Sequence, residues 1–192
     1  MLAKYLEYNE VGKLGRVIEI GSGVGLSGIA AAACNAEYVL LTDLPYTLKT
    51  IQDNVDATLK AWGDDDDDDD DDDDKKDTEK TTCNRTLIEV DVLDWSDLPS
   101  KSQSFDTVLS ADCVWIPDLV PAFIQTLVHL RSSSSSSSHF RVLLSHQTRS
   151  LETDRLLFSG LESNHFKIQQ INTHKTLPKE YFVSKIRIYE LT

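Results

Sequence analysis

The chain has 192 residues, enough for one domain with a sizeable core, and its hydrophobic content of 40% is ordinary for a globular protein. Its formal net charge is −13, but eleven of these charges come from the aspartate run 64–74, without which the net charge is −2. This balance argues against nucleic acid as a partner, since phosphate binding requires a basic face. No apolar stretch approaches eighteen residues, so the sequence predicts no membrane span and no membrane partner.

The cysteines are few, odd in number and widely spaced, at Cys34, Cys83 and Cys113. This pattern offers no disulfide framework and no zinc site, so we expect no bound metal. The first ten residues, MLAKYLEYNE, include acidic side chains and no apolar signal core, which predicts no secretion signal. We therefore expect a monomer in the cytoplasm, with the nucleus as the alternative compartment.

The first predicted elements flank a glycine-rich turn. Residues 2–8 have the apolar spacing of a short helix, and RVIEI at 16–20 is typical of a buried strand. The Ala-rich segment 26–33 predicts a helix. Between strand and helix, GSGVG places glycine at every second position, which permits a tight turn and a close approach of a ligand to the backbone. The amides that begin the helix favour a polar, partly anionic ligand at this turn.

A second predicted strand, Tyr38–Thr42, ends in Asp43, eighteen residues after Gly25. A carboxylate at this place accepts hydrogen bonds from ribose hydroxyls. The glycines follow Glu19 in an E-x-G-x-G-x-G pattern, which resembles the S-adenosylmethionine (SAM) site of Rossmann-like methyltransferases more than the G-x-G-x-x-G pattern of dinucleotide sites. The alternatives are a nicotinamide enzyme and a tight strand–helix turn that binds nothing.

The middle of the chain contains a helix and two low-complexity runs. Residues 44–62 repeat apolar side chains at helical spacing. Residues 63–80 include eleven consecutive aspartates and are predicted to be a disordered acidic insert. The insert is either a tolerated surface insertion or a docking tail for a basic partner. The serine run 132–138 predicts a flexible loop.

The remaining pattern completes an α/β fold in a single domain, residues 1–192. Strands are predicted at 86–90, 107–110, 141–145, 166–171 and 185–189, and helices at 119–130 and 153–161. Because no crossover-length helix separates the last two strands, we expect them to be antiparallel, at the end of an otherwise parallel, doubly wound sheet. Ligands in such sheets bind beyond the carboxyl ends of the strands, near the point where the strand order reverses. His146 follows the fifth predicted strand, where we expect a surface or loop position; the alternative is that it borders the substrate cleft.

The motifs IEIGSGVGLSGIAAA, LLTDLP, VLDWSDLP and FDTVLSADCVW, together with Asn54, resemble the seven-strand methyltransferases of family 16. That family includes protein-lysine methyltransferases that act on chaperones, elongation factors and valosin-containing protein. The resemblance covers nearly the whole chain apart from the two low-complexity runs. It is strongest to fungal and plant members that carry DCVW and SHQ-x-RS.

The resemblance implies SAM as cofactor and assigns residues to each part of it. Gly21 and Gly23 would face the methionine part, Asp43 the ribose, and Asp94 and Trp95 the adenine, where an aromatic ring stacks. The alternative for Trp95 is plain core packing. The complete cofactor-binding set implied is Glu19, Gly21, Ser22, Gly23, Gly25, Asp43, Asp94, Trp95 and Ala111.

Residues Asp112 to Trp115 match the D-x-x-Y-type motif of the family, with Trp in place of Tyr. Methyl transfer to an amine requires the acceptor to be held near the methyl group and its developing positive charge to be stabilised. Asp112 could orient the amine, and the face of Trp115 could stabilise the cation. The alternative is that Asp112 caps a turn and Trp115 is packed.

The resemblance also implies a longer N-terminal region, with a tryptophan-containing segment over the cofactor, whereas Met1 to Gly15 precede the first predicted strand. We therefore expect a more open cleft. The function that the sequence favours is SAM-dependent N-methylation of lysine side chains in a protein substrate. The alternatives are a small-molecule N-methyltransferase on the same fold and a catalytically inactive interaction protein.

Overall fold

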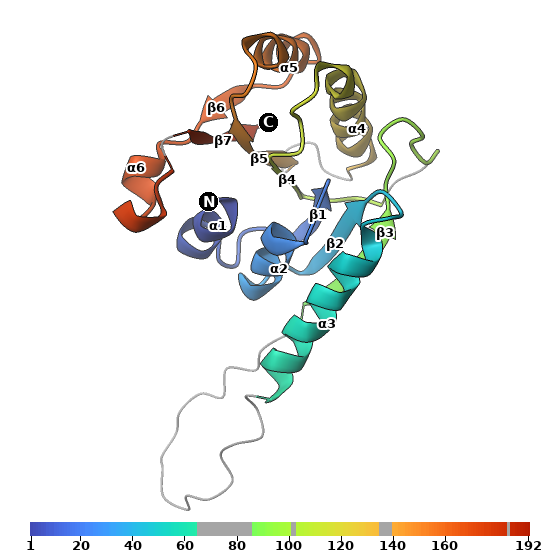
Figure 1. The fold of residues 1–192 in the computed structure, drawn as a ribbon, viewed down its shortest axis with the longest axis vertical. Helices are drawn as coiled ribbons and strands as arrows, with labels where there is room; N and C mark the ends of the chain where they lie inside the picture. The colour runs from blue at the N-terminus through green and yellow to red at the C-terminus, as the bar shows by residue number, and fades with distance from the viewer. Residues whose placement is uncertain (65–85, 101–102, 135–139, 184) are drawn as a thin grey trace, which may run out of the picture.

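A computed structural model describes residues 1–64, 86–100, 103–134, 140–183 and 185–192. These residues form one seven-stranded sheet in the order β3-β2-β1-β4-β5-β7-β6, with helices on both faces (Figure 1). The strands are β1 (Arg16–Ile20), β2 (Tyr38–Asp43), β3 (Leu87–Val92), β4 (Thr107–Ala111), β5 (Arg141–Gln147), β6 (Ile168–Gln170) and β7 (Ile186–Leu191). The helices are α1 (Leu2–Asn9), α2 (Leu26–Ala33), α3 (Leu48–Asp64), α4 (Val120–Ser133), α5 (Leu151–Ser163) and α6 (Thr173–Thr176), with 3-10 turns η1 (Pro117–Leu119) and η2 (Lys179–Tyr181).

The strand directions confirm the predicted fold class. The strands β1 to β5 pair in parallel, and β7 pairs antiparallel with both β5 and β6. The chain builds outward from β1 to β2 and β3, then returns to place β4 on the other side of β1. The reversal of strand order therefore lies between β1 and β4, and their carboxyl ends are the expected place for a ligand.

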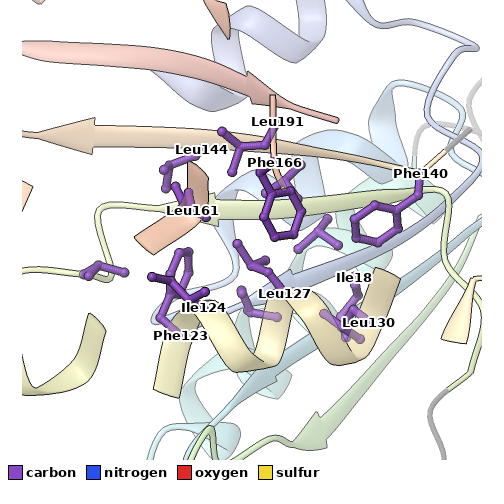
Figure 2. Close-up of a cluster of buried hydrophobic side chains, with 14 of the residues drawn as sticks. Ile18, Phe123, Ile124, Leu127, Leu130, Phe140, Leu144, Leu161, Phe166 and Leu191 are labelled. Atoms are coloured by element: carbon purple, nitrogen blue, oxygen red, sulfur yellow. The ribbon is translucent and has the colours of Figure 1, made fainter. Parts of the chain in front are cut away.

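Alternating side chains of the strands supply two cores, one on each face of the sheet. Ile18 and Ile20 of β1 belong to the cluster under α4 and α5, whereas Val17 belongs to the cluster under α1, α2 and α3. Figure 2 shows the first cluster, in which Phe123 and Leu127 of α4 extend toward the sheet, and both are fully buried. Burial of apolar surface on both faces explains the Val- and Ile-rich strands.

Several element boundaries differ from those predicted, and three of the differences concern His146 and the two low-complexity runs. Strand β5 continues through Gln147, so the prediction of a surface or loop His146 was wrong: the side chain is 3% exposed inside the strand. Helix α3 includes positions 63 and 64, which were assigned to the acidic insert, and α4 includes positions 132 and 133 of the serine run. Position 134 of the serine run is also described. The remaining positions of the two runs, 65–80 and 135–138, lie outside the described residues. No helix in the described part of the chain is both long enough and apolar enough to span a bilayer.

Candidate active site

The glycine-rich turn after β1 is held by the end of β2. Gly21, Gly23 and Gly25 all have positive φ angles, of 65°, 60° and 80°, a region that glycine adopts without steric cost. The backbone N–H of Gly23 donates to Asp43 Oδ2 at 2.8 Å, and the N–H of Leu44 donates to Asp43 Oδ1 at 2.7 Å. Asp43 therefore fixes the turn and retains a free lone pair on each oxygen for a ligand.

Gly21 is also required by packing. A Cβ atom at this position would lie 2.8 Å from the Cβ of Cys113 and 3.2 Å from the Trp95 ring. Only glycine lets β1, the segment after β3 and the segment after β4 converge here. Gly23 has no neighbour within 4 Å of such an atom, so its side faces open space.

Two predicted residues lie beneath the turn. Glu19 is 1% exposed, and one of its carboxylate oxygens accepts from the N–H of Gly28 at 3.1 Å, which ties β1 to α2. Burial raises the pKa of Glu19 to about 7, against the opposing effect of hydrogen bonds from Gly28, Ser27 and Ser22. The Ser22 hydroxyl donates to the carbonyl of Glu19 and accepts from the N–H of Thr42. Both residues brace the turn from below.

A cavity of about 430 Å³ opens at the carboxyl ends of β1 to β4, within the size range of small-molecule sites. Five predicted residues line it: Gly21, Asp43, Asp94, Trp95 and Trp115. Its wall is completed by apolar side chains that were not among the predicted site residues, including Tyr46, Leu93, Cys113, Ile116, Leu119 and Ala122. Their signal was weak because apolar residues after a strand also indicate core packing.

Asp94 and Trp95 form one end of the cavity. Oδ1 of Asp94 accepts from both the hydroxyl and the N–H of Ser96, and these bonds lower the pKa of the carboxyl. The Trp95 ring packs edge-on against Phe123, with 5.3 Å between ring centroids. Trp95 thus packs against the core on one side and lines the cavity on the other.

The segment after β4 separates the two predicted catalytic residues. Trp115 lines the cavity and is 55% exposed. Asp112 has a φ of 58° and is not among the cavity-lining residues. Its two oxygens accept a bidentate pair of hydrogen bonds from Arg149, at 2.8 and 2.6 Å. Arg149 was missed because it lies 37 positions away in a loop, although a cation shortly after the fifth strand was a usable signal.

Ala111 and Cys113 complete the segment. Ala111 is partly buried and packs toward the core under α2, and it does not line the cavity. The thiol of Cys113 lies 2.8 Å from the hydroxyl of Ser110, and burial raises its pKa to about 12. The thiol stays protonated at neutral pH, so Cys113 serves as cavity wall and not as a nucleophile.

Comparison with known protein families decides what kind of enzyme this cavity belongs to. A family model described as lysine methyltransferase matches residues 1–67 and 72–164. The chain belongs to the lysine methyltransferase family. The resemblance inferred from the sequence is confirmed, and the cofactor of such an enzyme is SAM.

Curated relatives support the same assignment. The chain is 28% identical over its whole length to EEF1A lysine methyltransferase 3 of Xenopus tropicalis, of which it covers 70%. It is 30% identical over 90% of its length to protein N-lysine methyltransferase METTL21A of Danio rerio, of which it covers 67%. It covers 61% of the mouse EEF1A lysine methyltransferase 3. The chain thus spans about two thirds of the length of these relatives.

Solved structures agree on the fold. A TehB-like SAM-dependent methyltransferase from Corynebacterium glutamicum matches all of this chain and 86% of its own, with a TM-score of 0.62 and 14% identity. The magnesium protoporphyrin IX methyltransferase of Synechocystis, solved with bound S-adenosylhomocysteine (SAH), matches 99% of this chain and 78% of its own, with a TM-score of 0.58 and 16% identity. At these identities the likeness concerns the fold alone.

Proposed function

We propose that this chain transfers a methyl group from SAM to the side-chain amine of a lysine in an acceptor protein. The observation that carries the proposal is the cavity at the reversal of strand order, where the glycine turn, Asp43, Asp94 and Trp95 meet. The names of the curated relatives support protein lysine as the acceptor. Bound SAM would supply the methyl group on a sulfonium; its transfer to an uncharged lysine amine would form the N–C bond, break the S–C bond and leave S-adenosylhomocysteine.

The residues present suit the cofactor in both shape and polarity. The side of Gly21 that faces the cavity has no room for a side chain, and the free lone pairs of Asp43 suit ribose hydroxyls. Asp94 supplies a carboxylate and Trp95 an aromatic face at the end where we place the adenine. Glu19, Ser22 and Gly25 act indirectly, because they shape the turn.

The acceptor lysine enters, in this proposal, beside Trp115. The exposed ring of Trp115 borders the cavity and can stabilise the developing cation through cation–π attraction. Asp112 pairs with Arg149 and does not line the cavity. We therefore place Asp112 at the entrance for the acceptor lysine, on the side opposite Trp115. Its charge is balanced by Arg149, which favours arrival of the lysine as an uncharged amine. We also propose that the protein acts as a monomer in the cytoplasm, a reducing compartment that suits its thiols Cys34 and Cys113.

The cofactor site is tested by calorimetric titration with SAH, which lacks the transferable methyl. The wild-type chain should bind SAH with a micromolar dissociation constant. Asp43→Asn should weaken binding at least about tenfold, because a charge-assisted hydrogen bond contributes about 1.5–3 kcal/mol.

The matched control is Asp53→Asn on α3, which removes the same charge from an exposed ion pair with Lys49. It should leave the affinity within about twofold of wild type. If circular dichroism shows that the wild-type chain is folded and calorimetry detects no SAH binding, the proposal is contradicted.

A further inference from the structure

A second cavity lies beyond β5, on the side of the sheet away from β3. Because β7 runs antiparallel to β5, Ile186 pairs with Gln147 and Arg187 with His146. The start of β7 therefore lies beside the carboxyl end of β5, on the same side of the molecule as the carboxyl ends of β1 to β4 and the cofactor cavity. The cavity has a volume of about 470 Å³ and is bordered by the end of β6, by α6 and by the start of β7. Figure 1 shows these elements at the end of the sheet opposite α3.

Two polar side chains that line this second cavity, Arg187 and Asn172, are exposed and open to a ligand. Arg187 makes no hydrogen bond or ion pair with any residue that the structure describes, in contrast to Arg141 and Arg149. Thr173, which is only 6% exposed as a residue, also lines the cavity. Asn172 precedes α6, but its side chain caps no N–H of that helix.

These groups are mainly hydrogen-bond donors around one full positive charge, a combination that suits a carboxylate. The positive charge of Arg187 is one of the causes that lower the pKa of Asp154. The oxygens of Asp154 already have other partners, because Oδ1 pairs with His146 Nε2 and Oδ2 accepts from the Thr148 hydroxyl. It leaves Arg187 available.

The surrounding segment has the opposite charge to the rest of the protein. Residues 167–192 contain five Lys or Arg and two Glu, a net charge of +3 in a chain whose formal net charge is −13. Four of the segment's five cations are Arg187 itself, Lys175 on α6, Lys179 on η2 and Lys185 just before β7. Such a local field attracts an acidic partner and repels a basic one.

We propose that this second cavity binds an acidic side chain, Glu or Asp, of the acceptor protein, and so selects lysines with an acidic neighbour; this rests on the function proposed above. The strands β4 and β7 are two strand spacings apart, about 10 Å. An extended peptide advances about 3.3 Å per residue. The acidic residue should therefore lie about three to five positions from the methylated lysine.

The direct test is a chemical-shift titration of the isotope-labelled chain with the tripeptide acetyl-Glu-Glu-Glu-amide. Saturable shifts are expected at Asn172, Thr173 and Arg187, and acetyl-Gln-Gln-Gln-amide should not produce them. Arg187→Gln should weaken binding of the glutamate probe at least about tenfold. Arg155→Gln, which removes the same charge from the exposed face of α5, should stay within about twofold of wild type.

Equal shifts with the glutamine probe, or unchanged binding by Arg187→Gln, would overturn the proposal. Inorganic phosphate is the competing anion: if it gives these shifts and the glutamate probe does not, the cavity is a phosphate site and the proposal fails. The titration needs no cofactor, and Arg187→Gln should bind SAH as wild type does. If the wild-type chain fails to bind SAH, the proposed function is refuted, whatever the result for the second cavity.

Discussion

At the scale of single residues, the cavity where we propose that SAM binds depends on the absence of one side chain. Gly21 combines a φ of 65° with a Cβ position that Cys113 already fills. Gly12 offers a natural comparison, because it has a similar φ of 70° and nothing within 4 Å of its Cβ position. An alanine at Gly12 would introduce backbone strain alone, whereas an alanine at Gly21 would introduce the same strain and also block the cavity.

Gly21→Ala should abolish SAH binding measured by calorimetry, since Cys113 and Trp95 must both move to admit the methyl group. Gly12→Ala should destabilise the fold by about 1 kcal/mol through φ strain alone and bind SAH normally. Normal SAH binding by Gly21→Ala would show that the turn is not where the cofactor lies.

Glu19 makes a pH-dependent contribution to stability. Its pKa rises from 4.5 to about 7 on folding, so between these values the folded state binds the extra proton. The contribution of Glu19 to the free energy of unfolding is therefore fully present below pH 4.5. It decreases by about 3 kcal/mol in all as the pH rises through 7. Glu19→Gln keeps an oxygen for the Gly28 N–H and removes the charge.

Urea denaturation should find Glu19→Gln more stable than wild type at pH 8 and similar to it near pH 5. If the two stability profiles run parallel from pH 5 to pH 8, the carboxyl is not the source of the effect.

At the scale of elements, a buried ion pair fastens α1 to the sheet. The guanidinium of Arg141 on β5 donates to Glu10 at 2.6 Å, and the hydroxyl of Tyr5 donates to the same carboxylate at 3.1 Å. The Glu10 side chain is 7% exposed. Removing Arg141 would leave a buried negative charge without its cation.

Arg141→Met should therefore lower the free energy of unfolding by about 3–5 kcal/mol in urea denaturation. Lys49→Met is the control, because the Lys49–Asp53 pair is exposed and contributes at most about 1 kcal/mol. A loss below about 1 kcal/mol for Arg141→Met would mean that Glu10 is neutral or solvated.

The elements that could be predicted from sequence are those whose signal is local. The strand, glycine turn and helix from Arg16 to Ala33 form as expected, because propensity and turn chemistry agree there. The end of β5 could not be predicted, since His146 is polar and becomes tolerable inside the strand only through its bond to Asp154, eight residues later. The pairing of Asp112 with Arg149 depends on the parallel neighbours β4 and β5, which no local pattern reveals.

At the scale of the whole molecule, the sheet gathers residues from four separate segments at one edge. Gly21, Trp95 and Trp115 follow β1, β3 and β4, and Asp43 is the last residue of β2. The four residues meet because parallel strands end together. The ends of β1, β2 and β4 could be predicted from the sequence to within one residue, which is why most of the polar residues that line the cavity could be predicted too. The second cavity could not, because it depends on β7 lying between β5 and β6.

The central claim is tested most directly by identifying the methylated residue. The purified chain is incubated with a proteome extract and methyl-labelled SAM, and the labelled proteins are hydrolysed and analysed by mass spectrometry. The account predicts label in N-methyl-lysine with the wild-type chain, a strong decrease with Trp115→Ala, and no decrease with Trp62→Ala on the surface of α3. Label confined to small molecules, or no label above that of the extract alone, would contradict it.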